Sequence, residues 1–328
     1  MRHFSTLVTF PMAPRPTHIL VVLDAGSQHQ PALERGVWLA ERTGATLELF
    51  VCDYDQDLSA AGPFDSAALQ CARRRLLSAH RRTLEARANR LAARGIRARV
   101  DVRWEHPLDA GVARKAAEAG ADLVVKSTRF HAELGRALFS PADWNLMAGC
   151  PANLWLVKPR PMVQKPTILA AIDPRPSLSG PGSLDERILE AGVALERAAG
   201  GELHVFHGFD ISSALAVSAE ALSAPISAPV RDLRTTLMHE HRNAVLALTD
   251  RHSIPAERVH VHEGPVRQLL IAWIRDMGVD VVAMGAVSRG ARPRPSIGST
   301  AELVLDEIPC DLLVVTPGRS GSGHVPEV

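Results

Sequence analysis

The chain has 328 residues, of which 46% are hydrophobic and 22% are charged, and its formal net charge at pH 7 is +1. This apolar content allows each of two domains to bury a full core, and the near-zero net charge argues against a nucleic-acid-binding surface. The longest apolar runs are strand-sized, and Pro11 and Pro14 interrupt the N-terminal segment before an apolar signal-type core can form. We therefore expect a cytoplasmic protein that partners neither nucleic acid nor membrane.

Short apolar runs alternate with helical stretches along the first half of the chain, after an N-terminal extension over residues 1–16. Five runs have the length and composition of strands: HILVVLD (18–24), TLELFVCDY (46–54), RARVDVRW (97–104), DLVV (122–125) and NLWLV (153–157). A proline-containing linker over residues 159–165 follows, since proline disfavours both helix and central strand.

The second half repeats this alternation and ends in a tail over residues 318–328 that we expect to be flexible. Its strand-like runs are ILAAID (168–173), ELHVFH (202–207), RVHVH (258–262), DVVAM (280–284) and DLLVV (311–315). Runs that are apolar on both faces and separated by helices are typical of parallel strands covered on each side. The sequence thus predicts an α/β fold with two tandem open five-stranded parallel sheets and helices on both faces, in domains over 17–158 and 166–317.

The two halves are related by an internal duplication. Pro107 corresponds to Pro265 and Asp122 to Asp280, and the last strands, 153–157 and 311–315, are equivalent. Pairing these strands would cover two sheet edges that otherwise invite aggregation. We expect the halves to pack within the chain as a pseudo-dimer. The sequence leaves undecided whether two whole chains also form a homodimer.

The segment GAVSRGARPRPSIGSTAE, residues 285–302, carries the main functional signal. It combines a glycine at the end of a buried strand, a long excursion and a Gly-Ser-Thr sequence that opens a helix. Amide groups at a helix N-terminus carry partial positive charge, and glycine lets an anion approach the backbone closely. The pattern therefore indicates a loop that folds around phosphate.

Four features together resemble the universal stress protein family. They are an aspartate at the end of the first strand, His204-Val205 in the second, Met284-Gly285 after the fourth, and the long loop that ends in Gly298-Ser299. The resemblance covers residues 17–160 and 166–317, and the tandem arrangement is most similar to the E-type members. It implies the universal stress protein fold, which resembles that of the adenine nucleotide alpha hydrolases.

The resemblance also implies a binding site for ATP or a related adenine nucleotide, with or without Mg²⁺, in the second half. Asp173 and Val205 would contact the adenosine, and Met284 and Gly285 would line its floor. The remaining nucleotide-binding residues would be Ser288, which stands where the family has a second loop glycine, and Gly298, Ser299 and Thr300 at the phosphates. Arg289, Arg292 and Arg294 would add positive charge near them.

A purely structural interpretation competes with this one. Ser299-Thr-Ala-Glu302 is also a capping box, which would begin a helix without any ligand. In the first half, Lys126-Ser127 replaces Met-Gly, and Ser140-Pro141 replaces Gly-Ser. Because Pro141 has no amide hydrogen and Asp143 places a carboxylate at the positive helix end, we expect a degenerate first half that serves as a structural partner.

Other constellations are weak. His260 and His262 alternate onto one strand face beside Glu263, but no third ligand stands at a recognisable spacing, so we expect no metal site. His239 and His241 lie in a polar helical stretch and are expected to be solvated.

Enzymatic activity has little support, and no catalytic residue is proposed. The sequence contains no Gly-x-Ser-x-Gly elbow or Walker lysine loop, and its last lysine is Lys165. The leading hypothesis is a stress-responsive regulatory protein that binds an adenine nucleotide in its second half. The alternatives are a binding module for a different small or amphiphilic ligand, located at the glycine loop or in the cleft between the halves, and a slow ATP hydrolase.

Overall fold

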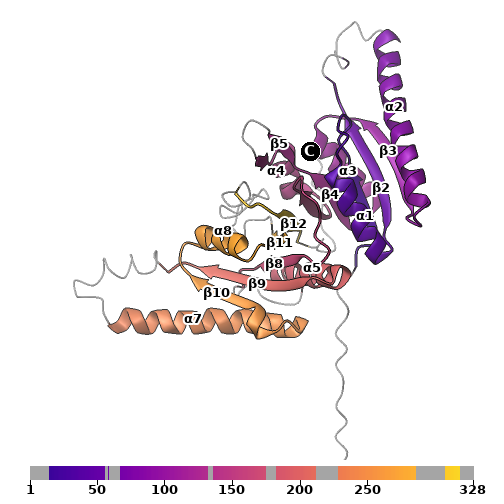
Figure 1. Cartoon of the computed structure of the whole chain (residues 1–328). Coiled ribbons are helices and arrows are strands. Elements are labelled where there is room, and N and C mark those ends of the chain that lie inside the picture. Colours follow the sequence, from indigo (N-terminus) through magenta and orange to yellow (C-terminus); the bar gives the residue numbers. More distant parts are fainter. Residues whose placement is uncertain are drawn as a thin grey trace, which may run out of the picture.

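The computed structural model describes residues 15–55, 58, 67–131, 136–174, 182–211, 228–285 and 307–317 (Figure 1). The elements of the first half are β1 (His18–Val22), α1 (Pro31–Thr43), β2 (Thr46–Asp53), α2 (Ala67–Ala92), β3 (Ala98–Trp104), α3 (Leu108–Ala119), β4 (Leu123–Ser127), a hairpin of β5 (Arg129–His131) and β6 (Arg136–Leu138), α4 (Pro141–Gly149) and β7 (Asn153–Val157).

The described elements of the second half are β8 (Thr167–Ala171), α5 (Leu184–Ala199), β9 (Glu202–Phe209), α7 (Ala228–Thr249), the short 3₁₀ helices η3 (Asp250–His252) and η4 (Ala256–Arg258), β10 (Val259–Glu263), α8 (Val266–Asp276), β11 (Val281–Gly285) and β12 (Asp311–Val315). All ten predicted strands are present, and β7 and β12 have the predicted bounds.

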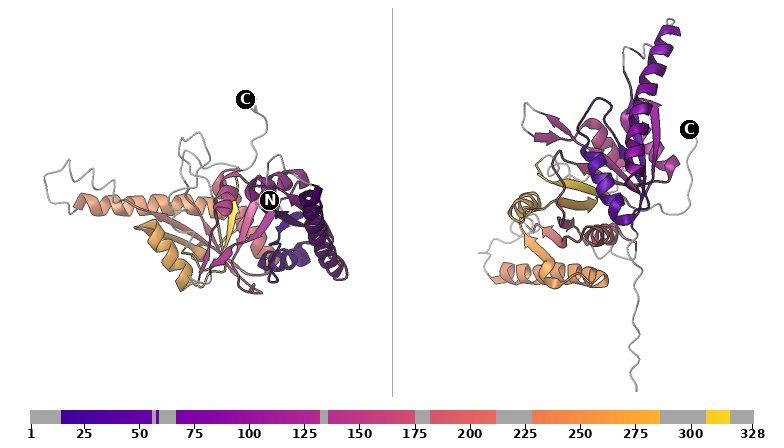
Figure 2. Two further views of the ribbon diagram at one scale, coloured as in Figure 1. Left: turned by 90° about the horizontal axis from the view of Figure 1, so that it is seen from above. Right: turned by 45° about the vertical axis from the view of Figure 1, so that its right-hand side comes forward.

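The strands of both halves form one continuous sheet in the order β10-β9-β8-β11-β12-β7-β4-β1-β2-β3. Each half contributes five parallel strands, as the sequence predicts. The halves join where β12 pairs antiparallel with β7, with Leu313 opposite Trp155. The long helices α2 and α7 therefore lie at opposite ends of the molecule (Figures 1 and 2).

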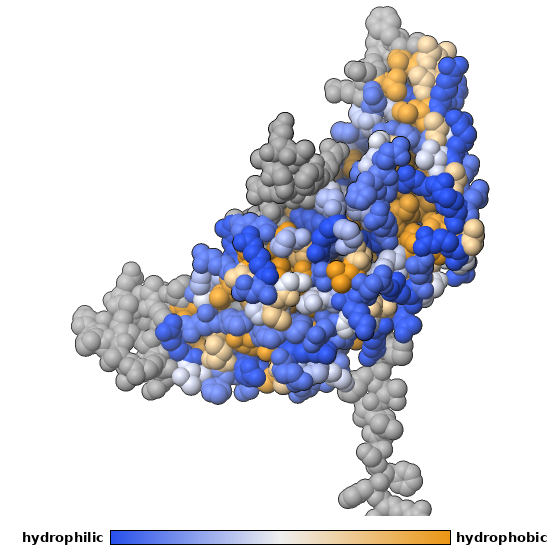
Figure 3. All heavy atoms as spheres, in the orientation of Figure 1, coloured by the Kyte–Doolittle hydropathy of each residue, from blue (hydrophilic) through white to orange (hydrophobic). Residues whose placement is uncertain are grey.

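Each face of the sheet carries its own hydrophobic cluster. One cluster packs the sheet against α1, α2, α5 and α7, and the other packs it against α3, α4 and α8. The part of α2 that extends beyond the sheet has apolar side chains along one side and hydrophilic ones along the other (Figure 3). Burial on both faces explains why the strands read as continuous apolar runs.

A shared glycine sets the first helix of each half close to the sheet. A Cβ atom added at Gly36 of α1 would lie 2.6 Å from Cγ2 of Val21, and one added at Gly192 of α5 would lie 2.9 Å from Cδ1 of Leu203. A larger residue would push these side chains away, so glycine favours the close approach, and the Leu-Glu-x-Gly-Val sequence common to both helices reflects the same packing contact in each half.

The linker between the halves is anchored to the second half. The Nη2 group of Arg160 donates to the carbonyl oxygen of Asp280 at 2.6 Å, and the backbone N–H of Lys158 donates to Asp311 at 2.9 Å. Asp280 also accepts a hydrogen bond from the N–H of Thr167, at the start of β8. These bonds fix the proline-containing segment at both of its ends.

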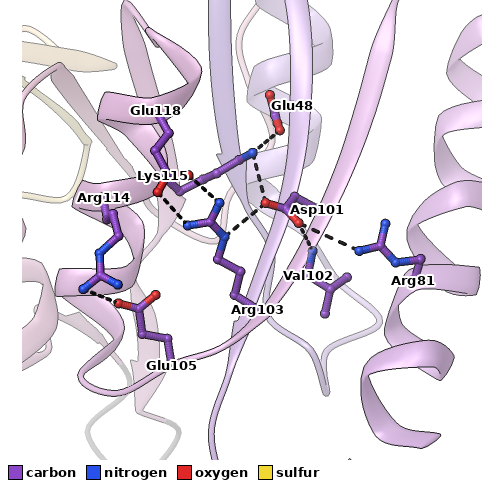
Figure 4. Close-up of polar contacts among 9 residues, drawn as sticks. All are labelled: Glu48, Arg81, Asp101, Val102, Arg103, Glu105, Arg114, Lys115 and Glu118. Carbon is purple, nitrogen blue, oxygen red and sulfur yellow. Dashed lines mark hydrogen bonds and ion pairs between the residues drawn. The ribbon is translucent and has the colours of Figure 1, made fainter. Parts of the chain in front are cut away.

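A network of charged side chains lies between α3 and the edge of the first-half sheet (Figure 4). Lys115 of α3 forms ion pairs with Glu48 of β2 and with Asp101 of β3, where its Nζ lies 3.0 Å from Oδ2. Arg103 bonds to Asp101 at 3.2 Å and to Glu118 at 3.1 Å. Burial would raise the pKa of Asp101, but the hydrogen bond and charge of Lys115, with Arg103, hold this pKa below its ordinary value.

Rings replace these charges at the equivalent place in the second half. Nδ1 of His204 lies 3.1 Å from Nε2 of His260, and the ring centroid of Trp273 lies 4.6 Å from that of His260. The duplication thus kept the backbone of the two halves while the chemistry beneath α3 and α8 diverged.

Candidate functional site

The carboxyl edge of the second-half sheet brings together three of the predicted residues. Asp173 lies two residues after the end of β8, and Met284 and Gly285 are the last residues of β11. Because β8 and β11 are parallel neighbours, with Ala171 opposite Met284, these residues share one edge. Open α/β sheets bind ligands at the carboxyl ends of their strands.

Gly285 has a packing reason to be glycine. A Cβ atom at this position would lie 2.5 Å from Cδ2 of Leu184, the first residue of α5. A larger residue here would require the Leu184 side chain to move, so packing favours glycine even without a ligand. This constraint also brings the N-terminus of α5 to the edge where Asp173 lies.

Val205 occupies a different place. It lies within β9, opposite Ala170 of β8 and Val259 of β10, and its side chain is fully buried in the core. Ala170 precedes Asp173 by three residues, so the Val205 side chain faces the core and lies below the edge that Asp173 occupies.

Two histidines that the sequence did not assign to the site lie beside Asp173. Nδ1 of His207 lies 3.0 Å from the carbonyl oxygen of Ile172, so the neutral ring carries its proton on this nitrogen and donates it there. Nε2 of His207 then accepts from Nδ1–H of His241 at 2.8 Å. The expectation that His241 is solvated is wrong, because this residue faces β9, whereas His239 is exposed as expected.

Burial lowers the pKa of both rings below the ordinary value of 6.5, although the Asp173 carboxylate acts in the opposite direction. Both histidines are therefore neutral at neutral pH. The ring of His241 also stacks on Phe209 with a centroid distance of 4.0 Å, which holds it against the strand. In the sequence, His207 follows Leu203 and Val205 at alternate positions of the strand, which places it on the same face of the sheet as those two core residues. This alternation is the sequence signal for the orientation of His207.

Asp185 of α5 completes the described part of this edge. It is 1% exposed, and its Oδ1 accepts a hydrogen bond from the backbone N–H of Asp173 at 3.0 Å. The start of α5 is capped by Ser183, which accepts from the N–H of Glu186. The α5 N-terminus thus orients the Asp173 backbone.

The predicted phosphate loop lies outside the described residues. This applies to Ser288, Gly298, Ser299 and Thr300 and to the arginines Arg289, Arg292 and Arg294.

At the equivalent edge of the first half, the start of α4 is occupied by side chains of the protein itself. Ser140 and Asp143 form a reciprocal capping box at the start of α4, as expected from the sequence. One carboxylate oxygen of Asp143 accepts from the Ser140 N–H at 2.7 Å, and the other lies 2.6 Å from Nζ of Lys126. Lys126 and Asp143 are both buried, so the helix start already holds an anion and its counter-ion.

A cleft of about 730 Å³ lies at this first-half edge. Its lining includes four carboxylates, which are Asp24, Asp53, Glu105 and Asp109. The backbone N–H of Asp24 bonds to Oε1 of Gln30, which makes this aspartate part of a turn. The lining also includes Lys126, and its excess of carboxylates makes the cleft unfavourable for phosphate.

Two further properties concern the described part of the chain. Within it, no group of three or more His, Cys, Asp or Glu side chains is arranged to hold a metal ion. Among the helices that the structure describes, none combines the length and apolar composition that crossing a membrane requires.

Comparison with known proteins identifies both halves. The model of the universal stress protein family matches residues 16–158 and again residues 166–316. Universal stress protein E of Escherichia coli (strain K12) is 25% identical over 306 residues, covering 92% of this chain and 94% of the relative. The universal stress protein E homolog of Haemophilus influenzae is 23% identical over 314 residues, covering 92% and 98%.

Solved structures show the same fold over the whole tandem. A crystal structure of a universal stress protein from Pseudomonas aeruginosa UCBPP-PA14 superposes with a TM-score of 0.69 at 24% identity, covering 92% of this chain and 94% of the other. One from Archaeoglobus fulgidus DSM 4304 superposes with a TM-score of 0.62 at 16% identity, covering 92% and 99%.

Proposed function

This chain belongs to the universal stress protein family, with two such domains in tandem, and we propose that it is a stress-responsive regulatory protein that binds an adenine nucleotide. The nucleotide, ATP or a close relative, binds at the carboxyl edge of the second-half sheet. The first domain is its structural partner.

One observation carries this proposal, namely that the two halves differ at the carboxyl ends of the equivalent strands β4 and β11. In the first half, Asp143 caps α4 and pairs with Lys126, so a phosphate would have to displace a buried carboxylate. In the second half, Met284 and Gly285 stand at the positions of Lys126 and Ser127, and no lysine occurs there. The lysine that holds Asp143 at the α4 start in the first half therefore has no counterpart in the second half.

The described residues of the second half fit a nucleoside. The carboxylate of Asp173 can accept hydrogen bonds from ribose hydroxyls, and it lies at the edge where parallel sheets bind ligands. His207 and His241 are neutral beside it, because burial lowers their pKa values. The phosphates would bind Ser288, Gly298, Ser299 and Thr300, whose roles rest on the family resemblance.

We further propose that the two domains form a pseudo-dimer in solution. Antiparallel pairing of β7 with β12 and the hydrogen bonds from the linker to Asp280 and Asp311 support this arrangement. Solution X-ray scattering is expected to give the profile of one compact particle. A profile of two independently moving domains would contradict it.

Two measurements test nucleotide binding. Mass spectrometry of small molecules released from the purified protein is expected to detect an adenine nucleotide. Calorimetric titration with ATP is expected to give one site per chain, and Gly298→Val is expected to abolish binding because its side chain would block close approach of the phosphates to the backbone. Two sites per chain, or normal binding by the Gly298→Val protein, would refute the assignment.

A further inference from the structure

The first helices of the two halves, α1 and α5, lie side by side over the junction of the sheet (Figure 1). Their sequences align as LERGVWLAERTG (33–44) and LEAGVALERAAG (189–200), and both helices end in a left-handed glycine. Arg35 therefore corresponds to Ala191 and Trp38 to Ala194. On the strands beneath, Asn153 of β7 corresponds to Asp311 of β12.

The first-half helix fills its side of the junction. Nε of Arg35 donates to Oδ2 of Asp311 at 2.8 Å, and both side chains are 1% exposed. The ring of Trp38 packs edge-on against that of Trp155, with a centroid distance of 6.4 Å and an interplanar angle of 89°. Large side chains thus occupy the space between α1 and the two central strands.

The backbone contacts of the junction are nearly symmetric, but the side chains are not. Asp311 accepts a hydrogen bond from the N–H of Lys158 at 2.9 Å, and Asn153 accepts the equivalent bond from the N–H of Thr316 at 3.1 Å. Asn153 and Ala191, which stand at the positions equivalent to Asp311 and Arg35, carry no charge. The substitution of two alanines for an arginine and a tryptophan leaves space on this side.

This space is a cavity of about 430 Å³, which we call the α1–α5 cavity. Its apolar walls come from both halves and include Leu39, Leu123, Trp155, Ala191, Ala194 and Leu313. Such a volume and such walls lie within the usual range of small-molecule sites. The cavity lies near the starts of β4 and β7, at the opposite edge of the first-half sheet from the 730 Å³ cleft.

The polar lining of the α1–α5 cavity favours an anion. Arg15 and Arg187 contribute two guanidinium groups, and Asp122 contributes one carboxylate. That carboxylate already accepts hydrogen bonds from the Thr17 N–H, the Thr17 hydroxyl and the His18 N–H.

Arg187 retains donors for a ligand. Its Nε donates to the carbonyl oxygen of Thr316 at 3.0 Å, which orients the guanidinium, and its two Nη groups make no hydrogen bond to the described residues. The amide of Asn153 accepts through Oδ1, so its Nδ2 group can also donate. Donors therefore converge beside an apolar cavity.

We propose that the α1–α5 cavity binds a small amphipathic organic anion, with a carboxylate on an apolar body. The carboxylate binds Arg187 and Asn153, since arginine pairs with carboxylates through two parallel hydrogen bonds. The apolar body of the ligand lies beside Ala191 and Ala194, in the space equivalent to the one that Arg35 and Trp38 fill in the first half. The ligand contacts both domains, so it also stabilises their junction.

The test uses the fluorescent amphipathic anion 1-anilinonaphthalene-8-sulfonate with the folded full-length chain. We expect saturable binding at one site per chain, displacement by decanoate, and no displacement by decylamine or by ATP. Binding that persists in excess ATP separates this cavity from the nucleotide site, so either proposal can fail alone. The absence of saturable binding, or displacement by ATP, would overturn the assignment.

Two variants and two controls locate the probe. Ala194→Trp introduces the residue that α1 has at the equivalent position, Trp38. Its ring should fill the cavity, so binding of the probe should be lost. Arg187→Gln should weaken binding about tenfold, whereas Arg187→Lys, which keeps the charge, should weaken it about threefold or less. Arg197→Gln, an exposed arginine of the same helix that does not line the cavity, should have no effect.

Thermal unfolding of each variant shows whether it is folded. If Ala194→Trp does not fold, the comparison of Arg187→Gln with Arg197→Gln decides the matter by itself. Equal affinities for these two proteins, or normal binding by a folded Ala194→Trp protein, would refute the proposal.

Discussion

The ammonium group of Lys126 lies 2.6 Å from a carboxylate oxygen of Asp143, and both side chains are buried at the carboxyl edge of the first-half sheet. The second oxygen of the same carboxylate caps the start of α4 through the Ser140 N–H. One carboxylate thus neutralises a helix terminus and a buried lysine together. The start of α4 is therefore already occupied by a carboxylate and its counter-ion.

Removing the lysine should destabilise the protein strongly. Lys126→Met leaves the Asp143 carboxylate buried without its counter-ion, and breaking a buried ion pair in this way costs about 3–5 kcal/mol. Lys126→Met/Asp143→Asn should lose less than Lys126→Met alone, because no uncompensated charge remains. Denaturant unfolding measures both. A double variant less stable than the single one would contradict this account.

The cap itself should contribute a smaller amount. Ser140→Ala removes a hydroxyl that accepts from the Asp143 N–H, so we expect a loss of about 1 kcal/mol in the free energy of unfolding. Nucleotide binding should be unchanged, since the proposed site lies in the other half. Reduced ATP affinity in this variant would place the ligand in the first half.

Two aspartates that end equivalent strands should respond differently to substitution. Asp173→Ala should weaken adenine-nucleotide binding much more than Asp24→Ala, because Asp24 faces an acidic cleft and a filled helix start. A carboxylate that bonds a ligand hydroxyl contributes about 1.5–3 kcal/mol, which corresponds to a loss of about 10- to 150-fold in affinity. Calorimetric titration of both proteins distinguishes the cases. Equal losses would argue against the assignment.

Stability should fall in mild acid because of the histidine pair. Burial lowers the pKa of His207 and His241 in the folded protein, whereas in the unfolded chain each titrates near 6.5. As the pH falls below about 6.5, the unfolded state therefore binds more protons than the folded state. The free energy of unfolding then decreases by at most about 1.4 kcal/mol per pH unit for each such histidine. Above this pH both histidines are neutral in the folded and the unfolded protein, so they cause no further change in the free energy of unfolding.

Replacing one ring should reduce this pH dependence. His241→Phe keeps the stacking on Phe209 but cannot be protonated, so its unfolding free energy should fall less steeply with pH than that of the wild type. His239→Gln, a change at an exposed position of the same helix, serves as the control. Identical slopes for wild type and His241→Phe between about pH 7.5 and 5.5 would show that the pair does not titrate as inferred.

The fold was predictable because its signals are local. Strands buried on both faces produce unbroken apolar runs, which is why β7 and β12 were predicted with their observed bounds. The capping box of Ser140 and Asp143 was also predictable, since its partners stand three residues apart. The hairpin of β5 and β6 was missed, because runs such as Arg129–His131 carry no apolar pattern.

The parts of the site that were missed depend on contacts between distant residues. His207 and His241 are 34 residues apart, and Arg35 and Asp311 are 276 residues apart. In the polar stretch of α7, composition alone could not show that His241 turns toward the sheet while His239 faces solvent. The buried face of α7 at this point is set by its contacts with β9, where His207 and Phe209 pack against His241.

The last prediction concerns the asymmetric junction, where the second half supplies its own control. Arg35→Met leaves the buried carboxylate of Asp311 with hydrogen bonds only from the Lys158 N–H and the Trp155 indole among the described residues. We expect a loss of about 3 kcal/mol in the free energy of unfolding, since a buried charge loses its counter-ion. Arg35→Met/Asp311→Asn removes both charges, so this side of the junction becomes uncharged like the equivalent positions Asn153 and Ala191. The Trp155 indole bonds to Oδ2 and the Lys158 N–H to Oδ1, so the single asparagine oxygen keeps only one of these bonds. Because no buried charge remains, the double variant should still lose less than Arg35→Met, about 1–2 kcal/mol. Denaturant unfolding of the two variants and of Asp311→Asn gives the coupling between the residues. Additive losses would mean that the arginine acts through packing rather than charge, and that the two sides of the junction differ for a reason other than this ion pair.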